Sequence, residues 1–256
     1  MFGAILGDII GSPFEFDRGN KSKKFPLFSE DSQFTDDTVM TLAVFYAFYK
    51  FKTRTEGKYK LGWYYTHVAP TEENMLKDLL VESMKYWGIK YPDAGYGAMF
   101  RQWLSQDNPE SYGSWANGSA MRVSPVAWVA DSLSETQKLA EMSAKVTHSH
   151  PEGVKGALAT ADAIFLARIG SSKEEIKEHI EYSYDYDLSR KIDDIRPNYK
   201  FDVSCQGSVP ESIICFLQAT DFEDTIRNAV SLGGDADTQA AIAGSIALLI
   251  VIVRLH

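Results

Sequence analysis

Cysteine is scarce in this chain: only Cys205 and Cys215 occur among its 256 residues. Two isolated cysteines match no metal-ligand spacing and are too few for a disulfide framework, so we expect neither a zinc site nor structural disulfides. Such a low cysteine content fits a reducing compartment, and we expect a cytoplasmic protein.

Long apolar runs are missing as well. The apolar stretch 240–253 contains Gly244 and Ser245, and it is shorter than the roughly 20 residues that a membrane-spanning helix needs. The first residues lack the basic cluster of a signal peptide, and Asp8 interrupts their apolar character. We therefore expect no membrane segment, and we expect 240–253 to form a buried helix.

Positive charge is also in short supply, since the net charge is −9. This balance argues against the broad basic surface that nucleic-acid-binding proteins carry, although a metal cluster can reverse the sign locally for an anionic ligand. The composition, 45% hydrophobic and 24% charged, is that of a globular protein with a sizeable core.

Domain boundaries and strand patterns are absent too. No linker rich in proline, glycine or serine, no internal repeat and no low-complexity tract divides the chain, so one domain over 1–256 is expected. Helical spacing of apolar residues recurs, whereas alternating strand patterns do not. The sequence therefore predicts an all-α, compact multi-helix bundle, with helices that include 2–10, 38–51, 72–87 and 151–169.

Several helix starts show capping signals. In a capping box, a serine and a glutamate or glutamine three positions later bond the free N–H groups of the first turn. Gly88 and Pro92 are expected to end the helix over 72–87. The expected capping residues are Ser134 with Gln137, Ser172 with Glu175, Ser208 with Glu211, and Asp221.

Two aspartates follow a glycine pair directly ahead of the apolar stretch, in Gly233-Gly-Asp-Ala-Asp-Thr238. Carboxylates are favourable at a helix start, where unpaired backbone N–H groups carry partial positive charge. Capping needs only one of them, while Asp235, Asp237 and Thr238 together form a compact set of hard oxygen ligands. This segment alone supports two interpretations equally: a metal site, or one aspartate that caps the helix beside another that is simply solvated.

A similar constellation lies far upstream, in Phe34-Thr-Asp-Asp-Thr38. Thr35, Asp36 and Asp37 precede the helix over 38–51, and adjacent carboxylates repel each other unless a cation or strong donors lie between them. Two acidic helix starts suggest one shared metal site. Because the ligands are carboxylate and hydroxyl oxygens, Mg²⁺ or Mn²⁺ is favoured over zinc.

Three loop features are weaker candidates. Asn117, Gly118 and Ser119 precede a helical start and can aim N–H groups at a phosphate, but a turn followed by a cap explains the same residues. Glu15 follows the first helix and can equally be an ordinary loop carboxylate. His148 lies between two helices, where a structural hydrogen bond is the alternative to a role in ligand binding.

Taken together, these segments resemble the ADP-ribosylglycohydrolase family, over nearly the whole chain. The chain is shorter than many members, and Ala236 replaces a threonine that is common there, but neither departure removes a ligand. The matching motifs, in family order, are Gly3-Ala-Ile-Leu-Gly-Asp-Ile-Ile-Gly-Ser-Pro-Phe-Glu15, Phe34-Thr-Asp-Asp-Thr38, Asn117-Gly-Ser-Ala-Met-Arg122, Thr147-His148 and Gly233-Gly-Asp-Ala-Asp-Thr238.

The resemblance implies an all-helical fold, a pair of Mg²⁺ or Mn²⁺ ions, and roles for particular residues. It implies catalytic roles for Glu15, Asp36 and Asp235. The implied metal ligands are Thr35, Asp36, Asp37, Asp235, Asp237 and Thr238, and the implied ADP-ribose contacts are Asn117, Gly118, Ser119, Met121 and His148.

The implied activity is hydrolysis of the glycosidic bond at C1″ of the distal ribose, which releases ADP-ribose from a modified acceptor. The expected substrate is a protein with mono-ADP-ribosylated arginine. Serine-linked, nucleic-acid and small-molecule conjugates are alternatives, with nucleic acid disfavoured by the acidic charge. A further alternative is a non-catalytic protein that binds ADP-ribose or only keeps the fold. The presence of every acidic ligand argues against this alternative.

Overall fold

The computed structural model describes residues 1–19, 21–55 and 70–253. Within these ranges the chain is helical, and its only β-type feature is an isolated antiparallel bridge between Ala116 and Ser204. The prediction of an all-α fold is confirmed. The helices are α1 (Phe2–Gly11), the 3₁₀ helix η1 (Ser12–Phe14), α2 (Asp36–Arg54), α4 (Pro70–Lys90), α5 (Ala98–Leu104), α6 (Gly118–Met121), α7 (Val126–Val129), α8 (Leu133–Lys145), α9 (Pro151–Arg168), α10 (Lys173–Tyr184), α11 (Ile192–Ile195), α12 (Cys205–Leu217), α13 (Phe222–Leu232) and α14 (Ala236–Val253).

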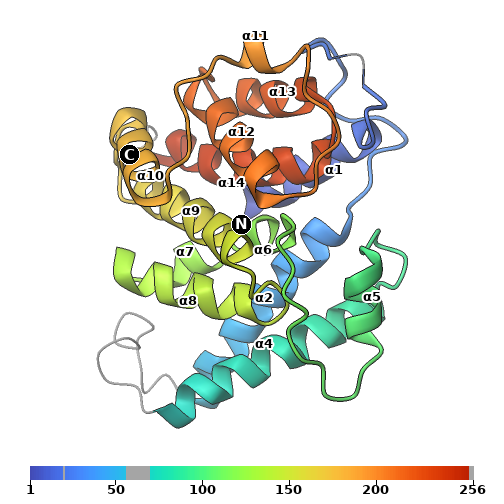
Figure 1. Cartoon of the computed structure of the whole chain (residues 1–256), viewed down its shortest axis with the longest axis vertical. Coiled ribbons are helices and arrows are strands. Elements are labelled where there is room, and N and C mark those ends of the chain that lie inside the picture. Colours follow the sequence, from blue (N-terminus) through green and yellow to red (C-terminus); the bar gives the residue numbers. More distant parts are fainter. Residues whose placement is uncertain (20, 56–69, 254–256) are drawn as a thin grey trace.

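Helix α9 crosses the middle of the molecule, with α12 to α14 on one side and α2, α4 and α8 on the other (Figure 1). Buried apolar side chains form one cluster on each side. Ala159 and Ala163 of α9 belong to the first cluster, whereas Ala157 and Ala161 belong to the second. Two residues turn a helix by about 200°, so α9 presents opposite faces to the two clusters and joins them.

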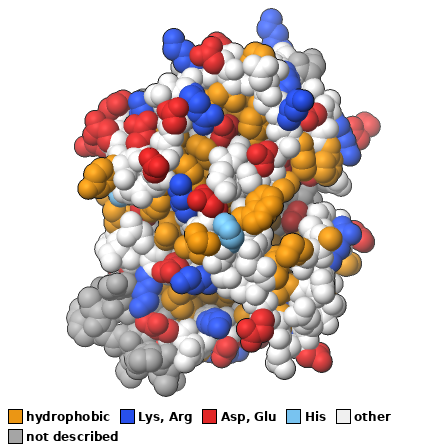
Figure 2. Space-filling view, viewed as in Figure 1, with side chains coloured by type: hydrophobic (Ala, Val, Ile, Leu, Met, Phe, Trp, Pro, Cys, Tyr) orange, Lys and Arg blue, Asp and Glu red, His pale blue; other side chains and the backbone are white. Residues whose placement is uncertain are grey.

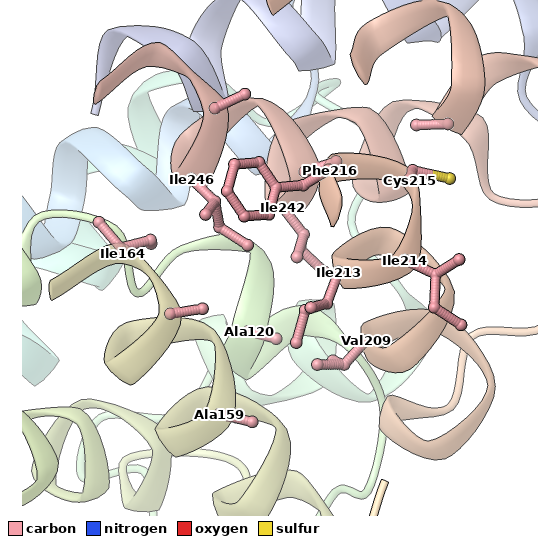
Figure 3. Packing of buried hydrophobic residues seen from close by; sticks show 14 of the residues in the cluster. Ala120, Ala159, Ile164, Val209, Ile213, Ile214, Cys215, Phe216, Ile242 and Ile246 are labelled. Carbon is pink, nitrogen blue, oxygen red and sulfur yellow. The ribbon is translucent and has the colours of Figure 1, made fainter. Parts of the chain in front are cut away.

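The cluster around α12 and α14 fixes the position of α14. Figure 3 shows Val209, Ile213 and Phe216 of α12 close to Ile242 and Ile246 of α14, and all five are fully buried. Burying a side chain of this size stabilises the fold by about 1.5–3 kcal/mol. The acidic segment at the start of α14 is therefore attached to a firmly packed helix, and no described helix is long and apolar enough to cross a membrane.

Helices α1 and α14 pack closely because α1 has a row of glycines. A Cβ atom added at Gly7 would lie 2.1 Å from the carbonyl oxygen of Ala240, and one at Gly11 would lie 2.5 Å from the Cα of Asp237. Only glycine permits such an approach of two backbones. The end of α1 is thereby placed beside the start of α14, so that the loop after α1 begins at the acidic segment.

The expected capping box at Ser134 is wrong by two residues. The hydroxyl of Ser132 accepts the N–H of Glu135, and the Glu135 carboxylate accepts the N–H of Asp131 at 2.7 Å. The segment contains two overlapping serine-to-acceptor spacings, and the earlier start leaves Gln137 free to donate to buried Asp162 at 2.8 Å. A long-range contact therefore decides between two locally equivalent starts.

The expected box at Ser208 is also wrong. Helix α12 begins after Ser204, whose hydroxyl accepts the N–H of Gly207 at 3.0 Å, so that Pro210 lies inside the helix. Ser208 instead donates to the carbonyl of Asp202 at 2.9 Å. Pro210 is in the second turn, where it cannot donate the internal hydrogen bond to the carbonyl of Gln206.

The remaining helix signals agree with the structure, with one exception. The Ser172–Glu175 capping box and the Asp221 cap are both confirmed. Gly88 does not end its helix, because α4 continues to Lys90. A Cβ at Gly88 would lie 2.7 Å from the Leu104 side chain of α5, so this glycine makes room for a neighbouring helix.

Candidate functional site

The two acidic helix starts lie side by side, although they are far apart in the sequence. Thr35 caps α2 by accepting the N–H of Asp37, and Asp237 lies in the first turn of α14. The Thr238 hydroxyl donates to Asp37 Oδ2 at 3.1 Å across the two helices. The structure thus places both predicted acidic segments in one site.

The glycine pair ahead of α14 shapes this site. Gly233 and Gly234 have φ angles of 75° and 74°, in the left-handed region that side chains other than glycine rarely adopt. The N–H of Gly234 donates to Asp17 Oδ1 at 2.7 Å, which ties the turn to the loop that carries Glu15. The loop itself is sharply bent, because Phe16 and Asp17 also have positive φ angles.

The carboxylates form two overlapping groups. In one, oxygens of Asp8, Asp37 and Asp237 all lie within 4.8 Å of one another, and in the other, oxygens of Glu15, Asp235 and Asp237 do so. Asp237 belongs to both groups. Apart from half-buried Glu15, all of these carboxylates are buried, which is costly for negative charges without a counter-charge.

Asp8 is a member that the sequence analysis did not single out. Its carboxylate accepts the N–H of Thr35 at 2.9 Å and the Thr35 hydroxyl at 2.8 Å, and it accepts the N–H of Thr38 at 3.1 Å. These bonds use both carboxylate oxygens, so we assign Asp8 to holding the start of α2 in place. The sequence signal that could have found it is a lone carboxylate within an otherwise apolar helix, since such a charge is rarely buried without partners.

Asp37 provides the observation that tests whether a cation fits. Its Oδ1 atom is buried and has no hydrogen-bond partner among the described residues. The pKa of Asp37 is raised well above its usual value by burial and by the charges of Asp8 and Asp36. An unpartnered buried oxygen among mutually repelling carboxylates, with no histidine or cysteine in either group, fits a hard divalent cation such as Mg²⁺ or Mn²⁺.

The two half-buried carboxyls of the site, Glu15 and Asp36, respond to the same charges. Burial, followed by the charge of Asp235, raises the pKa of Glu15 from 4.5 to about 7. Burial, followed by the charges of Asp8 and Asp235, raises the pKa of Asp36 from 3.8 to about 8. In the metal-free protein these groups therefore hold protons at a pH at which a free carboxyl has lost them.

The pH dependence of stability follows from these shifts. A carboxyl with a higher pKa in the folded protein binds its proton more tightly there, so the stability that it contributes is present at low pH and disappears as the pH rises toward the folded pKa. From Glu15 and Asp36, we expect the metal-free protein to lose thermal stability between about pH 4 and pH 8. Differential scanning fluorimetry across this range measures the effect.

Added Mg²⁺ provides the control. Because the ion replaces protons on the carboxylates, it should raise the melting temperature strongly at about pH 8 and only slightly at about pH 5.5. A melting temperature that Mg²⁺ raises equally at both values would contradict the link between these carboxyls and the ion.

A cavity of about 450 Å³ opens beside the carboxylates. Its acidic wall contains Glu15, Asp36, Asp37, Asp235, Asp237 and Thr238. The other lining residues include Asn117, Gly118, Met121, Arg122 and His148, together with the aromatic side chains of Phe16, Phe100, Tyr112 and Phe201. A volume of this size and a mixed apolar and polar lining are typical of sites for small molecules.

Two of the predicted site residues do not line this cavity. The hydroxyl of Thr35 is bonded to Asp8, as described above, and that of Ser119 donates to the carbonyl of Gly153 at 2.6 Å. Asp36 lines the cavity but belongs to neither carboxylate group. The metal role expected of Thr35, the metal and catalytic roles expected of Asp36, and the ADP-ribose contact expected of Ser119 stay predictions.

Asn117 connects the cavity wall to the acidic groups. Its side-chain amide donates to Asp235 Oδ2 at 2.6 Å and to the Ser208 hydroxyl at 3.0 Å. Its backbone N–H donates to the carbonyl of Val203 at 2.7 Å, so this N–H is not free for a phosphate. The residue thus orients Asp235, a role that the sequence analysis did not assign to it.

Several known proteins have similar sequences, and a solved structure has a similar fold. The ADP-ribosylglycohydrolase family model matches residues 1–247. An uncharacterised protein of Archaeoglobus fulgidus is 35% identical over 144 residues, which cover 50% of this chain and 47% of that protein. ADP-ribosylhydrolase ARH3 of Homo sapiens is 29% identical over 217 residues, which cover 62% of this chain and 60% of that protein.

The matched region thus spans about half to three fifths of the length of these two relatives. ADP-ribosylhydrolase ARH3 of Gallus gallus is 24% identical over 96% of this chain and 83% of its own length. A solved structure of an ADP-ribosylglycohydrolase-related protein complex superposes with a TM-score of 0.66 at 21% identity, covering 97% of this chain and 84% of that one, and it supports the fold. With a family model that matches nearly its whole length, the chain belongs to the ADP-ribosylglycohydrolase family.

Proposed function

We propose that this protein is a metal-dependent hydrolase that releases ADP-ribose from a modified acceptor. The observation that carries the proposal is the pair of buried carboxylate groups sharing Asp237, placed on the wall of a cavity of about 450 Å³. Family membership supplies the substrate class. A structural protein has no need to bury several uncompensated carboxylates, since each lowers stability unless a cation is bound.

In this proposal Asp37, Asp235 and Asp237 hold about two Mg²⁺ or Mn²⁺ ions, with Asp36, Thr35 and Thr238 as further candidates. When bound, the ions supply Lewis-acid activation and neutralise negative charge at the reacting centre. Glu15, in one group with Asp235 and Asp237, has a pKa raised to about 7 in the metal-free protein. It is the candidate to move a proton as the glycosidic bond breaks.

The remaining cavity residues bind the ADP-ribosyl group. Asn117 holds Asp235 in place, while Gly118, Met121 and His148 line the same cavity as the acidic groups. We also infer a location in the cytoplasm and a single domain over the whole chain. Both cysteines are free and buried, which agrees with a reducing compartment.

The acceptor that we propose is arginine on a protein. A guanidinium leaving group is cationic, and Glu15 and Asp36, which are half-buried and line the cavity, can attract it when bound metal has displaced their protons. Figure 2 shows acidic and basic side chains interspersed over the face that it presents, without a continuous field of lysine and arginine. That distribution, with the net charge of −9, favours a protein substrate over a nucleic acid.

A release assay tests this proposal. The purified protein is mixed with peptides carrying ADP-ribose on arginine or on serine, and with DNA carrying it on a terminal phosphate, each with and without Mg²⁺. We expect Mg²⁺-dependent release that is fastest from arginine. Faster release from serine or DNA would reverse the choice of acceptor, and no release from any substrate would overturn the activity itself.

A further inference from the structure

Arg122 is a buried cation that neither the motifs nor the carboxylate groups explain. It is 1% exposed and lines the cavity. Its NH2 group donates to the carbonyl of Ser143 at 2.9 Å and to the Thr147 hydroxyl at 2.8 Å. Among the residues that the structure describes, no carboxylate forms an ion pair with it, and its Nε is buried without a partner. A buried charge is costly, so its contacts call for a functional explanation.

Thr147 links Arg122 to His148. The Thr147 Oγ1 atom lies 2.7 Å from His148 Nδ1, while its other neighbour, Arg122, can only donate hydrogen bonds. Oγ1 therefore accepts from Arg122, and its own proton is available for the Nδ1 atom. With the hydrogen bonds aligned in one direction, away from the cation, each strengthens the next. The opposite arrangement would point an N–H of His148 toward the positive charge.

Tyr112 lies close to this chain of hydrogen bonds. Its ring centroid lies 6.0 Å from that of His148. Burial raises the pKa of the Tyr112 phenol, so Tyr112 is a neutral neighbour of the His148 ring.

We propose that Arg122 and Thr147 are positioning residues that hold His148 as the neutral tautomer with its proton on Nε2, ready to donate to an oxygen of the ligand. His148 and Gly118 both line the cavity, and the Nε2 atom is the part of the ring nearest to Gly118, because a Cβ added there would lie 3.1 Å from it. Burial, followed by the charge of Arg122, lowers the pKa of His148 well below its usual value, which keeps the ring neutral. The identity of the ligand, an ADP-ribosyl group with phosphate and hydroxyl oxygens, rests on the proposed function.

The tautomer can be read directly by NMR. In ¹⁵N-labelled protein, long-range ¹H–¹⁵N spectra distinguish the protonated from the unprotonated ring nitrogen, and loss of one signal set in His148→Gln assigns it among the five histidines. We expect the Nε2–H form throughout about pH 6–8. Thr147→Val should produce a mixture of tautomers, while Thr147→Ser, which keeps the hydroxyl, should restore the wild-type spectrum.

ADP-ribose affinity gives the second readout. Loss of an aligned donor should weaken ADP-ribose binding about 2- to 13-fold in Thr147→Val, as expected for one hydrogen bond, while Thr147→Ser should bind as the wild-type protein does. Thr225→Val is the matched control, since it removes a buried hydroxyl that bonds the carbonyl of Asp221 away from the cavity. Calorimetry with ADP-ribose as the probe measures all three variants.

Each outcome decides the proposal. An Nδ1–H tautomer in the wild-type protein overturns it, and so does a Thr147→Val variant that keeps both the wild-type tautomer and the wild-type affinity. If Thr147→Val does not fold, the wild-type spectrum and Thr147→Ser still decide. The spectrum is recorded without ligand or turnover. The expected tautomer in a protein that releases no ADP-ribose would therefore support the positioning and reject the proposed function.

Discussion

Asp237→Asn should reduce ADP-ribose release by more than roughly 100-fold, the upper end of the losses found for groups that merely support a metal ligand. Asp237 is the carboxylate shared by both groups, so its replacement removes one negative charge from the whole site. Asp235→Asn should behave similarly, because Asp235 belongs to the group with Glu15. Asp36→Asn should lose less, since Asp36 lines the cavity outside both groups.

The stability of Asp237→Asn separates a damaged site from a damaged fold. The pKa of Asp237 is raised well above its usual value by burial and by Asp37, Asp235 and Glu15. Neutralising it relieves this repulsion, so the metal-free variant should melt at or above the wild-type temperature near pH 8, and Mg²⁺ should raise its melting temperature less. Titration calorimetry with Mg²⁺ measures the lost affinity.

The matched control is Asp221→Asn, which changes the capping aspartate of α13. Asparagine caps a helix about as well as aspartate, and Asp221 lies outside the cavity and both carboxylate groups. This variant should keep normal turnover and normal Mg²⁺ affinity. If Asp237→Asn matched it in both measurements, Asp237 would be an ordinary residue of the first helical turn and not a ligand.

Glu15→Gln should lower kcat by about 10²- to 10⁴-fold while ADP-ribose still binds, the range expected when a general acid or base is removed. The glutamine keeps the size of the side chain, and the loop is held independently by the Asp17–Gly234 hydrogen bond. The variant should also lose the part of the pH–rate profile that reports the Glu15 carboxyl. Steady-state kinetics at several pH values measures both effects.

The exposed loop residue Glu30 offers a control of the same chemistry in Glu30→Gln. It should leave kcat, KM and the pH profile unchanged. A Glu15→Gln variant with a raised KM and a normal kcat would show that Glu15 acts in admitting substrate and does not transfer a proton. Unchanged kinetics would remove Glu15 from the site altogether.

The sequence predicted the helices and the acidic segments because both have local signals. Apolar spacing marks a buried helix face, and Thr35 and Asp221 each cap a helix through atoms of neighbouring residues. Where two local signals compete, a long-range contact decides. The sequence predicted that Ser134 caps α8, whereas Ser132 caps it in the structure, where Gln137 donates to Asp162.

Contacts between distant segments could not be predicted from the sequence, because the signals in the sequence are local. The position of Asp8 depends on the close approach of α1 and α14, and its bonds to Thr35 and Thr38 exist only after α1 and α2 meet. Likewise, the Arg122–Thr147–His148 chain requires α6 to lie against the end of α8. The sequence shows an arginine beside the apolar residues that follow it, but neither its burial nor its partners could be inferred from that.

The direct test of the metal-dependent activity is to count ions and turnover on the same samples. Metal-free protein is titrated with Mn²⁺, and at each ratio the bound ion is measured by electron paramagnetic resonance and ADP-ribose release is measured from an arginine-linked substrate. We predict no release without metal and release that rises with occupancy to a plateau at about two ions per chain. Full turnover by protein shown to contain no metal would contradict the account.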